Sequence, residues 1–529
     1  MVKENISFKD TGLFSQLMVD YVTQQEKLQP FYNHFPSEDQ FIAQTRIKKE
    51  SYNNRKVLCD SLLSQYANSK IHSKVLENLQ ALQDENTFTI TTGHQLNLFT
   101  GPLYFVYKIL CVIRMCEELN QKQTEFRYVP VYWMATEDHD FEEINHFNYE
   151  GKVIHWHTDQ KGAVGRFTLE NIKPIFDTFK SLLPNSHKKE VLLQWFQEAY
   201  LQSSTLSEAT RKLVNILFEE YGLIIVDGDD VRLKELFRPY VSAELLQQES
   251  YQKISKTNAE LEKLGYKIQV NPREINLFYL KDNLRERIVK TDNQYVVNNT
   301  SLVFSEEEIL QELNNHPDRF SPNVMLRPLY QEVILPNVAY VGGGGEIAYW
   351  LQLKTFFESQ HIAFPILKLR NSALIIEENL LPQIASLGLE IKDIFHSENE
   401  LFTKLVRQNT ELELSLHAYQ NRINEELENL QSVAVKTDVT FEKSLQAQKR
   451  KWEKTFEILE KKLLKAEKKK QEYQREKIKN IAEKIHPHGK IQERYANLSE
   501  MIIKTQLDFI QQVKNNMNPF EDEFIILGF

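Results

Sequence analysis

The sequence predicts an α/β core followed by a long helical arm, and three observations carry this prediction. Two β-rich runs, at 88–92 and 128–135, flank a helical stretch that begins near Pro102, which is typical of a parallel βαβ unit. The run 222–227 is apolar without interruption, as expected of a strand buried on both faces. After about residue 375 glycine becomes rare and Lys and Glu dominate, which favours exposed helices.

The elements of the core follow in chain order. Residues 1–85 place apolar side chains at helical spacing, and we expect them to form an N-terminal helical segment of a core that occupies 86–375. Within the core we expect strands at 153–157, 339–341 and 364–369, helices at 190–202, 205–221 and 240–265, and short strands with turns over 268–305.

The arm is predicted at 376–500. Mostly apolar residues alternate spacings of four and three from Leu412 to Val433, and again from Leu445 to Tyr473, with Glu426, Lys449 and Lys470 as the polar exceptions. A polar break at 437–440 separates the two stretches, so we predict an antiparallel helical coiled coil. The tail, 501–529, is expected to pack back on the core.

The composition excludes several function classes. Of the 529 residues, 41% are hydrophobic, enough to bury a large core. The chain has 64 basic and 74 acidic residues, and its net charge of −10 disfavours a nucleic-acid partner, because phosphate binding needs a basic surface. No apolar run approaches the ~18 residues of a membrane span, and the N-terminal sequence lacks the apolar core of a signal peptide. We therefore expect a cytoplasmic protein without a membrane partner.

The first candidate site segment, 91–104, lies between a predicted strand and a predicted helix. Gly93 and Gly101 let the backbone approach a ligand closely, and the following helix start offers N–H groups to a phosphate or carboxylate. We predict substrate or nucleotide binding by Gly93, Gln95, Thr100 and Gly101 and a catalytic imidazole at His94. A tight turn without a ligand remains the alternative.

The second segment, 136–146, follows a core strand at its carboxyl end, where open α/β sheets bind ligands. Carboxylates crowded around an imidazole suit proton transfer, because such crowding separates their pKa values. The candidate residues are Glu137, Asp138, His139 and Asp140 for catalysis and Asn145 for binding. Metal binding by this cluster and a solvated loop that caps a helix are the alternatives.

The third segment contains Arg327 and a glycine run that begins at Gly342 and Gly343. Arg327 offers a guanidinium fork to a carboxylate or phosphate. Gly342 and Gly343 follow a strand and precede a helix, which suits a phosphate- or substrate-binding turn, although neither a P-loop nor a GxGxxG pattern is present. Glu346 is a candidate catalytic base or a favourable acid in the first helical turn.

The fourth segment interrupts the long helices near the base of the arm. His488, Gly489, Lys490 and Arg494 could bind an anion there, and we predict a possible second nucleotide site. The alternative is a helix break packed on the core.

Four motifs in this order resemble one known family. TGHQLNLFTGPLY at 92–104, EDHDFEEINH at 137–146, RPLYQEVILPNVAYVGG at 327–343 and HPHGKIQER at 486–494 resemble the bacillithiol biosynthesis cysteine-adding enzymes, the BshC family. The resemblance spans essentially the whole chain. It implies a Rossmann-like core similar to class I aminoacyl-tRNA synthetases and nucleotidylyltransferases, with inserted connecting regions and a C-terminal antiparallel coiled coil.

The resemblance also implies an activity. The expected reaction adds cysteine to the glucosamine amine of glucosaminyl malate, the last step of bacillithiol biosynthesis, in a homodimer formed through the coiled coil. ATP (yielding ADP or AMP) is the expected activator by analogy, although the HIGH and KMSKS signatures are not clear in this sequence. We expect no tightly bound metal beyond Mg²⁺ carried with the nucleotide.

The implied mechanism gives three groups a role. Arg327 would orient the malate carboxylates, Glu346 the cysteine amine, and one carboxylate or His139 would take a proton from the attacking ammonium. Two other function classes stay open: a metal-dependent hydrolase that uses 137–140 and His146, and a non-catalytic coiled-coil scaffold.

Overall fold

The computed structural model describes the chain except residues 1–2, 68–70, 435 and 437–438. Its centre is a five-stranded parallel sheet with the strand order β13-β12-β2-β3-β6. The strands are β2 (Thr87–His94), β3 (Arg127–Met134), β6 (Ile224–Asp227), β12 (Asn337–Gly342) and β13 (Ile366–Leu369). The chain proceeds from β2 to β3 and β6 on one side, then returns to β12 on the other. The order therefore reverses between β2 and β12, the point where such sheets bind ligands.

The predicted βαβ unit is confirmed. The helix α6 (Tyr104–Lys122) leaves β2 and leads to β3, which pairs parallel with β2 from Thr87 opposite Arg127 to His94 opposite Met134. The threonines of β2 are buried, and the hydroxyls of Thr89, Thr91 and Thr92 donate to β12: Thr91 Oγ1, for example, donates to Asn337 Oδ1 at 2.7 Å. The strand therefore holds these three hydroxyls in the core with hydrogen-bond partners.

Two inserted regions cover the ends of the sheet. Between β3 and β6 lie β4 (His146–Tyr149), β5 (Lys152–His155), α8 (Lys173–Leu182), α9 (His187–Phe196) and α10 (Leu206–Phe218). Between β6 and β12 lie α11 (Val231–Gln247), α12 (Glu249–Lys263), β7 (Leu277–Lys281), β8 (Leu284–Thr291), β9 (Gln294–Val297), β10 (Val303–Phe304), α13 (Glu306–Asn315), β11 (Phe320–Pro322) and α14 (Arg327–Ile334). The strands of the second insertion form a separate antiparallel sheet.

The N-terminal segment is mainly helical, with one difference from the prediction. Its longer helices are α2 (Gln16–Val22), α3 (Glu38–Ser51), α4 (Arg55–Gln65) and α5 (Ser73–Ala81). Residues 3–7, however, form the strand β1 (Lys3–Ser7), which pairs antiparallel with β15 (Glu523–Gly528). The strand β14 (Ser372–Ile376) pairs parallel with β15 on its other side. This third sheet joins both ends of the chain, and its pairing is entirely non-local.

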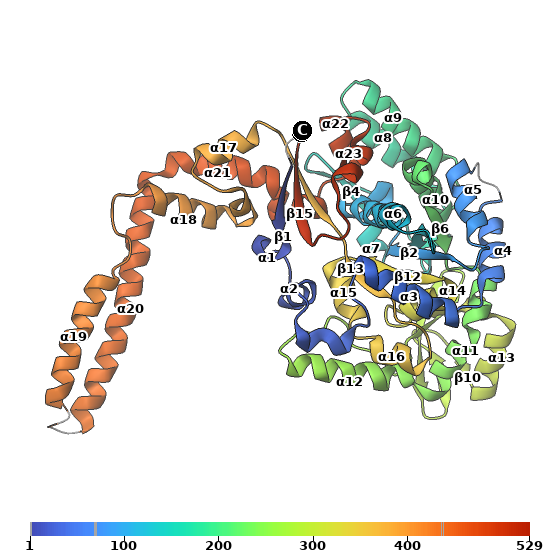
Figure 1. Ribbon diagram of the computed structural model, residues 1–529, viewed down its shortest axis with the longest axis horizontal. Coiled ribbons are helices and arrows are strands. Elements are labelled where there is room, and N and C mark those ends of the chain that lie inside the picture. Colours follow the sequence, from blue (N-terminus) through green and yellow to red (C-terminus); the bar gives the residue numbers. More distant parts are fainter. Residues whose placement is uncertain (1–2, 68–70, 435, 437–438) are drawn as a thin grey trace.

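The arm projects away from the core (Figure 1). It consists of α18 (Glu398–Asn409), α19 (His417–Ala434), α20 (Val439–Lys470) and α21 (Glu472–Ile485). The helices α19 and α20 run antiparallel, and Lys449 of α20 pairs with Glu428 of α19 at 3.2 Å. The helix α19 starts at His417, so Leu412 and Leu416 of the predicted heptad seam lie before it. The predicted polar break lies partly outside the described residues.

The tail after the arm returns to the core. It contains α22 (Leu498–Lys504), α23 (Phe509–Asn516) and β15. Among the described helices, none is both long and apolar enough to cross a bilayer.

Candidate active site

The candidate site lies at the carboxyl ends of β2 and β12, where the strand order reverses; we call the space between these two strand ends the crevice. Gly93 is the penultimate residue of β2, and a Cβ there would lie 3.3 Å from Tyr340 Oη and 3.5 Å from Arg327 Nη1. At Gly342, a Cβ would lie 3.0 Å from the Glu346 side chain. The two predicted glycine positions are therefore explained by close packing around the crevice, because any side chain would crowd these groups.

Glu346 is held by a lysine that the sequence analysis missed. Lys108 of α6 is 1% exposed, and its Nζ contacts the Glu346 oxygens at 2.7 and 3.0 Å and the Gly93 carbonyl at 2.5 Å. Tyr340 Oη and the Gly343 N–H donate to the same carboxylate at 2.7 and 2.8 Å. Burial alone raises the pKa of Glu346, but Lys108 and the hydrogen bonds outweigh it and lower this pKa to about 2.

This geometry corrects the predicted roles of Glu346. Each of its oxygens already accepts two hydrogen bonds, so neither proton abstraction nor binding of the cysteine amine fits. A carboxyl with so low a pKa is also a weak base. We assign Glu346 instead to fixing the Gly343 turn and the Lys108 ammonium at the floor of the crevice.

The Glu346 carboxylate predicts a specific pH dependence. Its folded pKa of about 2 lies below its ordinary value of 4.5, so its contribution to stability is present above about pH 4.5 and is lost as the pH falls toward 2. We expect Glu346→Gln to be less stable than wild type at neutral pH and the difference to shrink with acidification. Urea denaturation between about pH 7 and about pH 3.5 measures this. The exposed Glu125→Gln variant should show no such convergence, and a constant gap for Glu346→Gln would contradict the assignment.

Three buried nitrogen atoms near these strand ends lack a hydrogen-bond partner among the described residues: Arg327 Nη2, Arg370 Nε and His94 Nε2. Arg370 Nε would lie 4.0 Å from a Cβ at Gly343. Arg327 Nη1 donates to Gln331 Oε1 at 3.0 Å, which fixes the guanidinium and leaves Nη2 available. Arg370 is fixed by Glu493, with contacts of 2.6 and 2.9 Å. Buried donors in native proteins nearly always have a partner, so an anion is the ligand that this crevice suits.

His94 lies between the rings of Tyr104 and Phe105, at centroid distances of 5.3 and 5.1 Å. Burial, reinforced by the nearby Lys108 charge, lowers the pKa of His94 to about 3. The imidazole is therefore neutral at physiological pH and is a poor base. The imidazole of His94 can position a ligand through a hydrogen bond. This role is more limited than the catalytic role that the sequence predicted.

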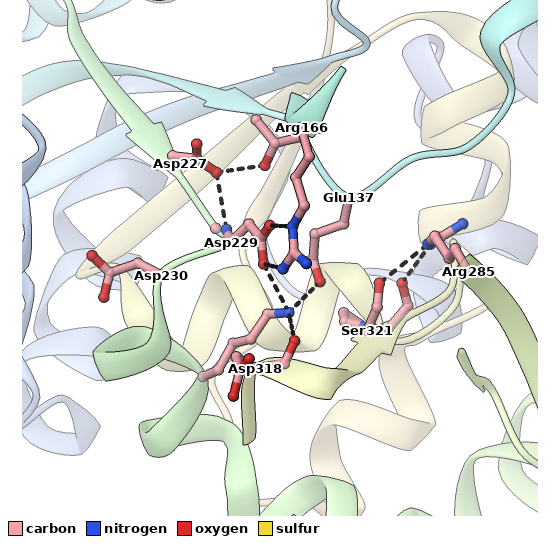
Figure 2. A network of polar contacts seen from close by, with 12 residues as sticks. Glu137, Arg166, Asp227, Asp229, Asp230, Arg285, Asp318 and Ser321 are labelled. Atoms are coloured by element: carbon pink, nitrogen blue, oxygen red, sulfur yellow. Dashed lines mark hydrogen bonds and ion pairs between the residues drawn. The ribbon is translucent and has the colours of Figure 1, made fainter. Parts of the chain in front are cut away.

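Glu137 belongs to a buried ion network rather than to an open catalytic loop (Figure 2). Lys234 of α11 contacts Glu137 at 2.7 Å, Asp229 at 3.1 Å and the Asp318 carbonyl at 2.9 Å. Arg166 binds Asp229 at 2.8 Å. Burial raises the pKa of Glu137, against the opposing effect of Lys234. The network ties the ends of β3 and β6 to both insertions, so Glu137 is better explained as structural than as a proton acceptor.

Asp138, His139 and Asp140 lie at the exposed rim of the site. The Asp138 Oδ1 accepts the His139 N–H at 2.7 Å, and Gln95 Nε2 donates to Asp138 Oδ2 at 2.9 Å. Gln95 also reaches Glu143 at 2.9 Å, so it ties the loop after β2 to the loop after β3. The structure thus brings these two predicted segments together.

The position of Arg285 favours proton transfer over metal binding at this rim. Within the described part of the chain, Asp138, His139 and Asp140 are the one group of three acidic or histidine side chains that could hold a metal. Arg285 Nη1, however, lies 2.5 Å from His139 Nδ1 and 4.0 Å from Asp138. A fixed guanidinium opposes a cation at this place. His146 stacks on His155 across the β4–β5 hairpin, at 5.0 Å, and does not join the group.

Three other predicted binding residues lie apart from the open crevice. Asn145 is 3% exposed and donates to Glu142 at 3.2 Å. Thr100 and Gly101 lie in a buried turn whose carbonyls face Asn497. The helix start after Gly101 is not open to an anion as predicted, because the Leu103 N–H donates to the Ala496 carbonyl at 2.9 Å.

The predicted second nucleotide segment lies beside a separate cavity of about 540 Å³. His488, Gly489 and Arg494 line it, whereas Lys490 does not. The lining also includes the aromatic side chains Phe14, Phe395 and Phe524 and the charged side chains Lys479, Glu398, Glu483 and Glu493.

The functional residues that the sequence analysis missed are all basic: Lys108, Lys234, Arg285 and Arg370. Lys108 interrupts a stretch that is otherwise apolar, which is a detectable signal because an unpaired buried cation is costly. Lys234, Arg285 and Arg370 lie in mixed sequence and give no such signal.

Comparisons with known proteins agree with this architecture. Residues 1–371 match the family model "Bacillithiol biosynthesis BshC, N-terminal Rossmann-like domain", and 373–529 match "Bacillithiol biosynthesis BshC, C-terminal coiled-coil domain". The predicted Rossmann-like core and C-terminal coiled coil are thereby confirmed.

Several relatives share the full length of the chain. A Flavobacterium psychrophilum protein named "Putative cysteine ligase BshC" is 45% identical and covers 100% of this chain and 99% of its own length. A protein of the same name from Flavobacterium johnsoniae is 42% identical and covers 100% of both chains. Another, from Bacillus cereus, is 28% identical and covers 94% of this chain and 95% of its own. A solved "putative arginyl t-RNA synthetase" from Campylobacter jejuni covers 80% of this chain and 100% of its own at 11% identity and a TM-score of 0.22, a similarity too weak to relate the two folds.

Proposed function

This chain belongs to the bacillithiol biosynthesis BshC family, and on that premise we propose that it is a ligase that joins cysteine to the glucosamine amine of glucosaminyl malate. The relatives' shared name supports cysteine as one substrate. The observation that carries the proposal for this chain is the crevice between β2 and β12, where Arg327 Nη2 and Arg370 Nε are buried without partners.

The unpaired donors suit the malate part of the acceptor. Malate contributes carboxylates, and a guanidinium that is already fixed on one side can bind a carboxylate through its remaining N–H groups. Gln331 fixes Arg327, and Glu493 fixes Arg370, so both donors are preorganised. We assign Arg327 and Arg370 to the acceptor's carboxylates, which places its amine toward the rim formed by the loop after β3.

Proton transfer is assigned to that rim. The amine that attacks must lose a proton. His139 Nδ1 accepts from Arg285, so the neutral ring carries its proton on Nε2 and is set to donate rather than to accept. Asp140 has the most exposed carboxylate of the group, 3.9 Å from His139 Nε2. We assign proton acceptance to Asp140, with His139 as its hydrogen-bonding neighbour.

Amide formation from a free carboxylate in water is unfavourable, so the cysteine carboxylate must be activated. We propose ATP as the activator, with Mg²⁺ carried by the nucleotide. When bound, ATP would supply a phosphate or nucleotide leaving group. The cavity beside His488 and Arg494 offers aromatic and basic side chains to a nucleotide. Glu398, Glu483 and Glu493 also line it and oppose a phosphate, so the Mg²⁺ carried by the nucleotide would have to offset their charge. This cavity is our candidate for a second nucleotide site.

We propose that this protein forms a homodimer in which the arms of two copies contact each other. Large apolar side chains stay exposed along α19 and α20: Tyr419, Leu430, Val433, Trp452, Ile458 and Leu459. A second copy of the arm is the occupant that the resemblance implies. We also propose a cytoplasmic location, in keeping with three cysteines that are all free and buried.

The test is a reconstituted reaction. Purified protein is incubated with cysteine and glucosaminyl malate, with and without Mg-ATP, and the thiol product and the nucleotide are followed by mass spectrometry. We expect product only with ATP, and release of AMP or of ADP identifies the bond that breaks.

Asp140→Asn should reduce turnover and leave binding of glucosaminyl malate intact. Product formation that needs no nucleotide would refute the proposed activation, and binding without turnover would favour the scaffold.

A further inference from the structure

The loop that follows β2 has an unusual backbone. Phe99, Thr100 and Gly101 have consecutive positive φ angles of 45°, 69° and 59°. Two of the three carry side chains, for which this left-handed conformation is strained. All three are buried. Such a conformation persists only when its surroundings hold it.

Asn497, nearly 400 residues later in the chain, holds this loop. Its Nδ2 donates to the carbonyls of Phe99 and Gly101, both at 2.8 Å, on either side of Thr100. Its Oδ1 accepts from the N–H and the hydroxyl of Ser499 at 2.9 and 2.6 Å, which fixes the orientation of the amide. Asn497 is 0% exposed, so water cannot replace these contacts.

The same C-terminal segment contacts the site at two further points. The Ala496 carbonyl accepts the Leu103 N–H, at the start of the helix that carries Lys108. Glu493 binds Arg370 through both carboxylate oxygens, and both side chains are buried. The segment thus touches the loop after β2 and the residue after β13, on the two sides of the crevice.

We propose that the segment Gln492–Asn497, contributed by the C-terminal coiled-coil domain, is a positioning element of the crevice, with Asn497 as the positioning residue that sets the loop Phe99–Gly101. The loop does not line the crevice itself. It joins the end of β2 to the helix that carries Lys108, so its conformation sets where Gly93 and Lys108 lie. The Rossmann-like domain therefore does not complete its own site. The inference rests on the proposed function in one respect: that the crevice binds the acceptor substrate. The loop's dependence on Asn497 is a property of the fold and can be measured without turnover.

The test replaces Asn497 with aspartate in the full-length protein. Asn497→Asp keeps the shape and the Oδ1 acceptor, but its second oxygen faces two carbonyl oxygens instead of donating to them. Hydrogen–deuterium exchange is followed at the amides of Phe99, Thr100, Gly101 and Leu103, since Pro102 has no N–H. We expect exchange at least about tenfold faster there, because two buried hydrogen bonds are lost. With active protein, the KM for glucosaminyl malate should rise while the KM for ATP stays unchanged.

Asn148→Asp is the matched control. Asn148 Nδ2 donates to the Tyr495 carbonyl at 3.0 Å. The same Asn-to-Asp substitution therefore removes a hydrogen bond to the segment Gln492–Asn497 without removing any hydrogen bond to the loop Phe99–Gly101. Its exchange at 99–103 should match wild type. Ser499→Ala removes only one hydrogen bond to Asn497 Oδ1, and it replaces Asn497→Asp as the test if that variant does not fold. We expect a smaller rise in exchange for Ser499→Ala.

The outcomes separate the two proposals. Exchange at 99–103 that is unchanged in folded Asn497→Asp, or equally raised in Asn148→Asp, would overturn the positioning role. Raised exchange together with a wild-type protein that makes no product would support the positioning role and count against the proposed reaction. Raised exchange with both KM values unchanged would show that the loop does not serve the acceptor site and would also overturn the inference.

Discussion

Replacement of Lys108 by methionine is expected to destabilise the core by about 3–5 kcal/mol, because it leaves an ionised carboxylate buried without its counterion. Lys108 is 1% exposed and contacts both Glu346 oxygens and the Gly93 carbonyl. Methionine has a similar volume, so little of the loss would come from a cavity. Urea denaturation followed by tryptophan fluorescence reports it, since Trp350 stacks on Tyr340 at 4.5 Å and Tyr340 donates to Glu346.

Two variants show whether the loss comes from the buried pair. Lys49→Met breaks the exposed pair with Glu85, at 3.2 Å, and should cost less than about 1 kcal/mol. Lys108→Met combined with Glu346→Gln should recover part of the loss, because the uncompensated charge is gone. An effect of Lys108→Met no larger than that of Lys49→Met would mean that water or another cation reaches Glu346.

Arg327→Lys is expected to lower kcat/KM for glucosaminyl malate by about 10²-fold, with a small effect on stability. The guanidinium uses one nitrogen to bind Gln331 and keeps Nη2 unpaired toward the crevice. A lysine keeps the positive charge, but its compact ammonium cannot serve both positions in a fixed geometry. Steady-state kinetics with glucosaminyl malate varied at saturating cysteine and ATP would measure the change.

Arg319→Lys serves as the matched control. Arg319 belongs to the same insertion and binds Glu312 at 2.6 Å, away from the crevice. Its kcat/KM should stay near that of wild type. If Arg327→Lys instead weakened the use of cysteine and left that of glucosaminyl malate unchanged, the anion bound at Arg327 would be the cysteine carboxylate and our assignment of the crevice would be reversed.

Much of the fold is predictable because its signals are local. Short runs of apolar and β-branched residues mark β2, β3, β6 and β12, and the heptad spacing marks the arm. The strand β1 and the strand β14 escape prediction, because each is stabilised by β15 at the far end of the sequence. A short polar run such as 3–7 has no strand signal of its own and becomes a strand only when a partner supplies its hydrogen bonds.

The location of the site is equally predictable. The candidate segments containing Gly93, Asp138 and Gly343 each follow a predicted strand, and the carboxyl ends of parallel strands meet at one edge. Residue types at strand ends therefore identify where the chemistry lies. They do not identify what each group does, because a role depends on the partners that surround it.

For this protein, the sequence alone determined the main elements of the core and the arm, the family, and the edge of the sheet where the candidate segments meet. The tertiary structure decided the roles. Glu346 is a structural carboxylate because Lys108 pairs with it. Glu137 is part of the buried ion network because Lys234 pairs with it. The His139 ring contacts Arg285. Burial, charge and hydrogen-bond saturation set the protonation of each group, and these partners come from helices and strands far away in the chain. Periodicity and motif spacing describe neighbours in sequence, whereas chemistry at a site depends on neighbours in space.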